Sequence, residues 1–188
     1  MKNYLLLFAT ALALASCAGT KQSTSTTTAH TGINPNENRE EKSPAGETIL
    51  IGPTTRVAFD QAPHSNWFHP TYQRYTPNAK IMEELTPLLE TVTFKAFVGS
   101  WCIDTQRDLP RFFKVLDMGR VPLTKLQMYS LREDRTSPTG EEKPYNITAV
   151  PTFIVYNKDG KELGRIVEVA YPTIEMQLLN IIKGTEKK

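Results

Sequence analysis

The sequence predicts an α/β fold: a central mixed β-sheet flanked by helices, with an N-terminal extension. Three observations predict it. Helical and strand-like patterns alternate from residue 78 onward. The last two predicted strands are joined by a tight turn at 157–160, where Asp-Gly supplies the positive φ that a hairpin needs. A β-prone run at 93–98 passes through a short turn into a helix, which is typical of a strand–helix unit.

The N-terminal part of the domain is predicted in less detail. An apolar run at 48–53 ends in Gly-Pro and predicts the first strand. Residues 60–75 are irregular and aromatic, and we expect this extension to pack its rings against the main sheet. A metal site at His64 and His69 is the less favoured alternative, because two histidines without a carboxylate or cysteine at ligand spacing are a weak metal signal. We therefore predict no metal and no cofactor.

The remaining elements follow from hydrophobic spacing and from start and stop signals. Asn78 is a good N-cap for a helix, and Gly119 ends the helix that follows Cys102. The segment 132–143 is charged and contains Gly and Pro, which predicts a loop. The predicted order is a helix from 78, a strand at 93–98, a helix up to 118, a strand at 126–130, that loop, strands at 152–156 and 162–169, and a closing helix at 173–182.

The first 17 residues indicate export. Lys2 precedes a ten-residue apolar run, 5–14, which is too short to span a bilayer. The run ends in Leu-Ala-Ser-Cys and resembles a bacterial lipobox, which implies a signal peptide at 1–16 and lipidation, palmitate included, at Cys17. The alternative is an ordinary signal peptide with a chance cysteine. The resemblance implies anchoring in the cell envelope, at the inner or the outer membrane, with the domain outside the cytoplasm.

Residues 17–46 are rich in Ser, Thr, Asn, Glu and Lys and contain almost no large apolar side chains. Such a segment cannot bury enough apolar surface to offset the entropy of ordering, so we predict a disordered tether and a folded domain at 47–188. The net charge of +2 gives no electrostatic reason to expect a nucleic acid partner.

Cys102 is the candidate reactive residue because it lies at the strand-to-helix junction. The start of a helix offers unpaired N–H groups and partial positive charge, both of which stabilise a thiolate. Cys17 is the only other cysteine of the chain. If Cys17 is lipidated through its sulfur, the mature protein carries one free thiol.

From about residue 78 to 183, the chain resembles the thioredoxin superfamily. The resemblance is carried by Trp101-Cys102 at a strand-to-helix turn, by Pro110 in the following helix, and by the segment 145–152, which is similar to the thioredoxin segment ending in a cis-proline. It implies a thioredoxin-like fold in which the Val150–Pro151 bond is cis and lies beside Cys102. It also implies that Trp101, Val150 and Pro151 form the platform on which a substrate rests.

Two departures from the family pattern change the expected chemistry. Thr105 occupies the position of the second, resolving cysteine, and Ala96 occupies that of the buried Asp that helps to deprotonate it. The domain therefore has no second cysteine that could resolve a mixed disulfide internally. We expect Cys102 to act as a nucleophile, with Thr105 as partner of its thiolate, on protein or small thiol and disulfide substrates. Release would need an external thiol or another cysteine of the substrate, as in isomerase-like or deglutathionylation-like chemistry.

Two alternatives remain open. The chain could be a non-catalytic thioredoxin-fold module that binds peptides or acts as a chaperone, with Cys102 left over. It could also be a one-cysteine peroxidase, in which Cys102 is oxidised to a sulfenic acid. The fold alone does not decide among these functions, because one fold hosts many activities.

Overall fold

A computed structural model of the chain describes residues 37–185. Within them, six strands form one sheet in the order β1-β2-β4-β3-β5-β6. The strands are β1 (Arg39–Lys42), β2 (Thr48–Thr54), β3 (Val92–Val98), β4 (Leu126–Ser130), β5 (Thr152–Asn157) and β6 (Glu162–Val167). The α-helices are α1 (Ser65–Arg74), α2 (Ala79–Leu89), α3 (Ile103–Met118) and α4 (Ile174–Lys183), and the 3₁₀-helices are η1 (Arg56–Asp60), η2 (Leu123–Lys125) and η3 (Lys143–Tyr145).

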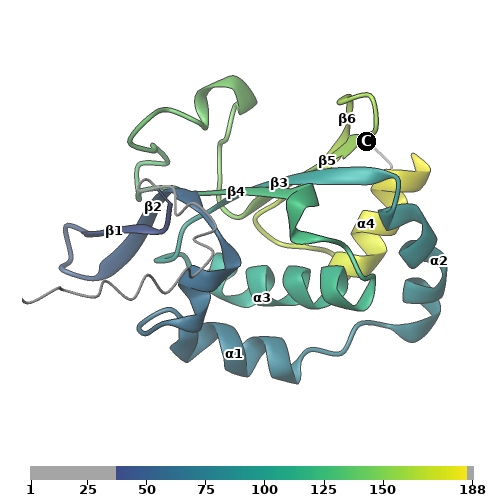
Figure 1. Cartoon of the computed structure of the whole chain (residues 1–188), viewed down its shortest axis with the longest axis horizontal. Coiled ribbons are helices and arrows are strands. Elements are labelled where there is room, and N and C mark those ends of the chain that lie inside the picture. Colours follow the sequence, from purple (N-terminus) through teal and green to yellow (C-terminus); the bar gives the residue numbers. More distant parts are fainter. Residues whose placement is uncertain (1–36, 186–188) are drawn as a thin grey trace, which may run out of the picture. The chain divides into compact units, whose positions relative to one another are not determined.

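The sheet is mixed, as predicted. β3 runs parallel to β4 and antiparallel to β5, and β5 pairs with β6 in a hairpin. The parallel pair is connected through α3, which is the crossover helix that two neighbouring parallel strands require. Figure 1 shows the four α-helices on one side of the sheet, whereas the segment between β4 and β5 rises on the other side.

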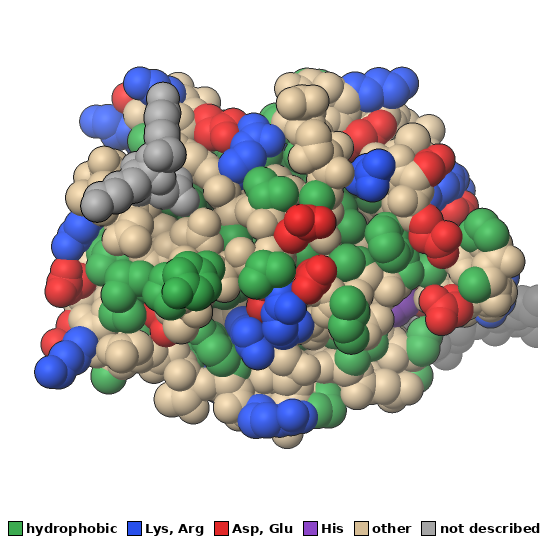
Figure 2. Space-filling view, turned by 180° about the vertical axis from the view of Figure 1, so that it is seen from behind, with side chains coloured by type: hydrophobic (Ala, Val, Ile, Leu, Met, Phe, Trp, Pro, Cys, Tyr) green, Lys and Arg blue, Asp and Glu red, His purple; other side chains and the backbone are tan. Residues whose placement is uncertain are grey.

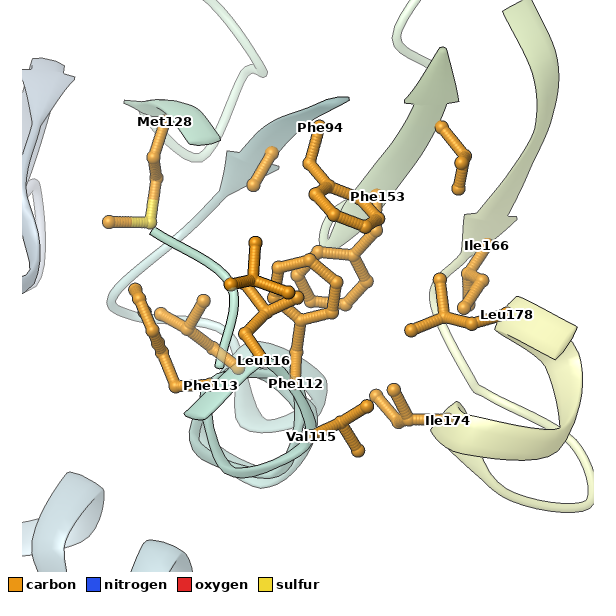
Figure 3. Close-up of a cluster of buried hydrophobic side chains, with 14 of the residues drawn as sticks. Phe94, Phe112, Phe113, Val115, Leu116, Met128, Phe153, Ile166, Ile174 and Leu178 are labelled. Atoms are coloured by element: carbon orange, nitrogen blue, oxygen red, sulfur yellow. The ribbon is translucent and has the colours of Figure 1, made fainter. Parts of the chain in front are cut away.

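The main core lies between the sheet and these helices. Phe112 and Phe113 of α3 point toward the sheet, where Phe112 stacks on Phe153 of β5 with ring centroids 4.3 Å apart (Figure 3). Ile174 and Leu178 of α4 complete the same cluster and are fully buried. This burial fixes α3, and with it the residues at the start of α3, against the strand that precedes them.

The opposite face of the sheet holds a smaller cluster. Phe97, Leu131, Val150 and Ile154 are buried there, and partly buried side chains that include Trp101 and Cys102 pack against them. Because β3 alternates its side chains between the two faces, Ala96 faces the main core and Phe97 faces the small one. Cys102 therefore packs against this small cluster.

Two sequence predictions need correction. Residues 39–42, inside the predicted tether, form β1. All four of its residues are charged, which is typical of a protected edge strand and gives no hydrophobic strand pattern. Residues 65–74 form the helix α1, where an irregular segment was expected, and α1 packs on α3. Phe68 of α1 meets Phe113 of α3 edge to face with centroids 5.7 Å apart, and this tertiary contact outweighs the poor helix propensity of a segment that contains Pro70.

The other elements agree with prediction to within a few residues. Asn78 caps α2 by accepting hydrogen bonds from the backbone N–H groups of Lys80 and Ile81. β6 ends at Val167, two residues early, because Glu168 has a φ of 59° and turns the chain out of the sheet. The predicted signal peptide, Cys17 and most of the predicted tether lie outside the described residues. Within 37–185, no helix is long and apolar enough to span a bilayer.

Candidate active site around Cys102

Cys102 is the N-cap residue of α3. β3 ends at Val98, a three-residue turn follows, and Cys102 has an extended backbone with φ −83° and ψ 127°. Its N–H donates to the Gly99 carbonyl at 2.8 Å, and its carbonyl accepts from the Gln106 N–H at 2.9 Å. The thiol is partly exposed, and it stands where the unpaired N–H groups of a helix begin. The position has the features expected of a reactive cysteine.

The Val150–Pro151 bond is cis, as the family resemblance implies. It brings the Val150 carbonyl beside the cysteine, and Cys102 Sγ donates a hydrogen bond to that oxygen at 3.4 Å. Val150 and Pro151 are themselves buried, so the backbone and not a side chain of this segment faces the thiol. Tertiary structure thus joins two motifs that are 48 residues apart in the sequence.

Trp101 is held firmly beside the thiol. Its indole N–H donates to the Leu131 carbonyl at 2.9 Å, and its ring lies so close to Gly99 that a Cβ atom there would stand 2.7 Å from Cε2. The glycine is therefore required by the close approach of the indole ring. The fold brings Trp101, Val150 and Pro151 together around Cys102. Their role in binding substrate stays a prediction.

Thr105 points to the inner side of α3. It is fully buried, and its Oγ1 accepts a hydrogen bond from the Gly99 N–H at 3.2 Å. The hydrogen bond of the Cys102 thiol goes instead to Val150, so Thr105 braces the turn that carries the cysteine. Its predicted role as partner of the thiolate stays a prediction.

The environment contains no resolving group within residues 37–185. Cys102 is the only cysteine of this range. Ala96, where the family resemblance implies that an acid is missing, is fully buried and paired in register with Met128 and Phe153. The described residues also contain no group of three or more His, Cys, Asp or Glu placed to hold a metal ion.

A buried carboxylate on α3 was missed by sequence reasoning. Asp108 is 1% exposed and receives two hydrogen bonds from Arg107, one from Arg111, and one from the Ala170 backbone N–H at 3.3 Å. The bond to Ala170 ties α3 to the segment after β6. The alternation of Asp and Arg at 104, 107, 108 and 111 was the available sequence signal.

The charges near α3 are mutually compensated. Hydrogen bonding to Asp108 raises the pKa of Arg107 above its already high usual value, and Asp104 adds to the effect at 2.8 Å. Farther away, burial lowers the pKa of His64, although Glu40 opposes the shift through a 3.1 Å contact. On the face drawn in Figure 2, basic and acidic side chains likewise lie among hydrophobic ones.

Comparison with known proteins gives structural matches only. No protein-family model matches the chain, and no curated protein does. A protein of unknown function from Pseudomonas aeruginosa is similar with a TM-score of 0.52 and 15% identity, over 67% of this chain and 87% of that one. The unit β3-α3-β4 followed by β5-β6-α4, with the strand order β4-β3-β5-β6 and a cis-proline before β5, decides the fold.

This arrangement is a thioredoxin-like fold. Solved thioredoxins are among the similar structures, at low identity. That of Fasciola hepatica is 18% identical, with a TM-score of 0.36 over 57% of this chain and 93% of its own. Oxidised mitochondrial thioredoxin 3 of Saccharomyces cerevisiae is 22% identical, with a TM-score of 0.35 over 61% of this chain and 98% of its own.

Proposed function

We propose that this thioredoxin-like protein carries out monothiol thiol–disulfide exchange through Cys102. The observation that carries the proposal is the partly exposed Cys102 Sγ at the start of α3, 3.4 Å from the Val150 carbonyl and next to the cis-Pro151 bond. A thiol in this setting meets an extended backbone segment on one side and helix N–H groups on the other. Both features favour attack on a disulfide that is presented along that segment.

The proposed reaction has two exchange steps. The Cys102 thiolate attacks one sulfur of a substrate disulfide, a mixed disulfide forms, and the other sulfur leaves as a thiolate with the electron pair of the broken bond. An external thiolate, or another cysteine of the substrate, then attacks the substrate sulfur of the mixed disulfide and releases the Cys102 thiolate. The sum is thiol–disulfide exchange, in which one thiolate is consumed and another is released, and not net oxidation of a dithiol, since Thr105 stands where the resolving cysteine would be.

The surface beside the thiol suits a polypeptide substrate. Ile103, immediately after Cys102, is 73% exposed. Its apolar side chain is available for contact with a polypeptide next to the thiol. The same side chain supports the second candidate function, a module that binds peptides without chemistry at Cys102.

One experiment separates the two candidates. The purified protein is treated with 2,2′-dithiodipyridine near neutral pH, and release of thiopyridone is followed by absorbance, with Cys102→Ala as the control. Reaction faster than that of free cysteine, with trapping of partner proteins as mixed disulfides, supports exchange. Reaction no faster than free cysteine, together with unchanged peptide binding and cellular function in Cys102→Ala, refutes exchange and favours the binding module.

We also propose that the protein is anchored to the bacterial cell envelope by lipid on Cys17. The support is the apolar run followed by Leu-Ala-Ser-Cys at 14–17. Growth with a clickable palmitate analogue should label the wild-type chain, whereas Cys17→Ser should remain unlabelled and leave the membrane fraction. Equal labelling of the two chains would refute the anchor and would leave the chemistry of Cys102 untouched.

A further inference from the structure

A cavity of about 410 Å³ lies between α1 and α3, next to the start of α3. Its volume is within the range of small-molecule sites, roughly 300–1,000 Å³. The lining combines three arginines with aromatic and apolar side chains, and no acidic residue takes part: its main members are Arg74, Arg107, Arg111, Trp67, Tyr75 and Ile103.

The three arginines differ in how many of their guanidinium N–H groups already donate to carboxylates. Arg107 is bound by Asp104 and Asp108 through all three guanidinium nitrogens. Arg111 gives one nitrogen to Asp108 at 3.3 Å, and its guanidinium lies 5.3 Å from the centre of the Tyr75 ring. Arg74 is exposed and makes no ion pair or side-chain hydrogen bond within residues 37–185. Arg74 and Arg111 thus keep donors that an incoming carboxylate can use in bidentate fashion.

The cavity borders the reactive turn directly. Ile103, the residue after Cys102, lines it, and Gln106 stands one helical turn further on. Gln106 and Trp67 also line an adjoining cavity of about 330 Å³, which reaches Ser100 and Trp101, the two residues before Cys102. The two cavities share Trp67 and Gln106 as lining residues, and Cys102 lies in the chain between Trp101, which lines one cavity, and Ile103, which lines the other.

We propose that this cavity binds the external thiol that resolves the mixed disulfide, and that this thiol is a small molecule bearing carboxylates. The inference rests on the proposed function, which leaves release to an outside thiol. The arginines hold the carboxylates, and the Trp67 and Tyr75 rings cover the carbon skeleton. The bound thiol loses its proton to water, and its sulfur attacks the substrate sulfur of the mixed disulfide. The bond to Cys102 breaks, Cys102 leaves as a thiolate, and the product is a disulfide between substrate and acidic thiol.

Binding can be tested without any redox step. Trp67 and Trp101 are the only tryptophans of the chain, so Trp101→Phe leaves a single fluorophore in the cavity wall. The full chain with this change and Cys102→Ser, in detergent, is titrated with methylthiosuccinate, a dicarboxylate without a thiol, and with its uncharged diamide. We expect a saturable change of Trp67 emission with the dicarboxylate only. Arg74→Gln should weaken binding about tenfold, the loss of one charge-assisted hydrogen bond.

The matched control is Arg120→Gln, which removes an exposed arginine just beyond the other end of α3 and should leave binding unchanged. An equal loss of affinity for the dicarboxylate in Arg74→Gln and Arg120→Gln would indicate general charge attraction and overturn the proposal. Equal response to dicarboxylate and diamide would overturn it too, as would tighter binding of a Glu-Ser-Glu tripeptide than of methylthiosuccinate, which would point to an acidic segment of a partner protein.

Resolution is tested on the methylthio adduct of Cys102, made with methyl methanethiosulfonate in the otherwise native chain. Attack of mercaptosuccinate on the outer sulfur should return the free Cys102 thiol, followed by mass spectrometry of quenched samples, with saturation kinetics, and Arg74→Gln should reduce its second-order rate about tenfold. Neutral mercaptoethanol should show a linear dependence on concentration in all variants. If both thiols respond alike to Arg74→Gln, the proposal is wrong even though Cys102 is reactive. If Cys102 forms no adduct, the proposed function fails, while the fluorescence titration still reports on the cavity.

Discussion

The close approach of Trp101 to Gly99 makes a substitution there a direct test of how the reactive turn is built. In Gly99→Ala, the new methyl group would lie 2.7 Å from Cε2 and 2.8 Å from Nε1 of the indole, well inside van der Waals contact. The ring is rigid, so it must move as a whole and give up its 2.9 Å hydrogen bond to the Leu131 carbonyl. Overpacking costs about 1–3 kcal/mol, and the hydrogen bond contributes about 1 kcal/mol.

The expected loss in the free energy of unfolding is therefore about 2–4 kcal/mol, measured by urea denaturation followed by circular dichroism. The same substitution in a Trp101→Ala background should cost less than about 0.5 kcal/mol, because no ring remains to be displaced. The difference between the two backgrounds is the energy of the contact. If Gly99→Ala costs as much without the indole as with it, the glycine is needed for another reason and the reasoning is refuted.

Three further predictions concern the same region. Ser100→Ala removes the Oγ that accepts the buried Leu50 N–H at 2.9 Å and should lower the unfolding free energy by about 1–3 kcal/mol, whereas a loss within error in urea denaturation would contradict this. Thr105→Val removes the acceptor of the Gly99 N–H and should lower the unfolding free energy by a similar amount, while the rate of Cys102 alkylation stays unchanged. Slower alkylation at unchanged stability would instead show that Thr105 is the partner of the thiolate. Burial lowers the pKa of His64 in the folded state, so the unfolded chain binds the proton more readily and stability falls as pH drops below about 6.5. The protonation of His64 lowers the free energy of unfolding by up to about 1.4 kcal/mol for each unit by which folding lowers its pKa. In His64→Gln, the unfolding free energy should therefore fall less between pH 7.5 and 5.5 than in the wild type. An unchanged pH profile would show that His64 is not the group responsible.

The limits of the domain also bear on how it should be produced. A chain that starts at Glu47 lacks β1, which pairs with β2 from Arg39 to Lys42. It also lacks Glu40, the partner of His64, and Glu41, which forms a 2.6 Å ion pair with Arg132. A chain that starts near residue 37 keeps these contacts and is the better choice for the urea denaturation measurements.

Much of this molecule follows from local sequence signals. The strand that leads to Cys102, the capped helix that begins at Asn78, and the Asp-Gly hairpin each carry a pattern that hydrophobic spacing and turn chemistry make recognisable. The prediction of the cis bond at Val150–Pro151 came from the family resemblance. These signals were sufficient for the α/β class, the mixed sheet and the central position of the cysteine.

Tertiary structure alone decided the rest. β1 is a charged edge strand, and α1 is a helix held by aromatic contacts with α3, so neither has a local pattern strong enough to predict it. The arrangement of Arg74 with Arg107 and Arg111 arises because α1 packs on α3 and brings residues more than 30 positions apart to one cavity. The sequence by itself determined where the thiol stands, at the start of a helix. Only packing determined what surrounds it, because the Val150 carbonyl that contacts the thiol and the Leu131 carbonyl that holds the neighbouring Trp101 come from separate parts of the chain.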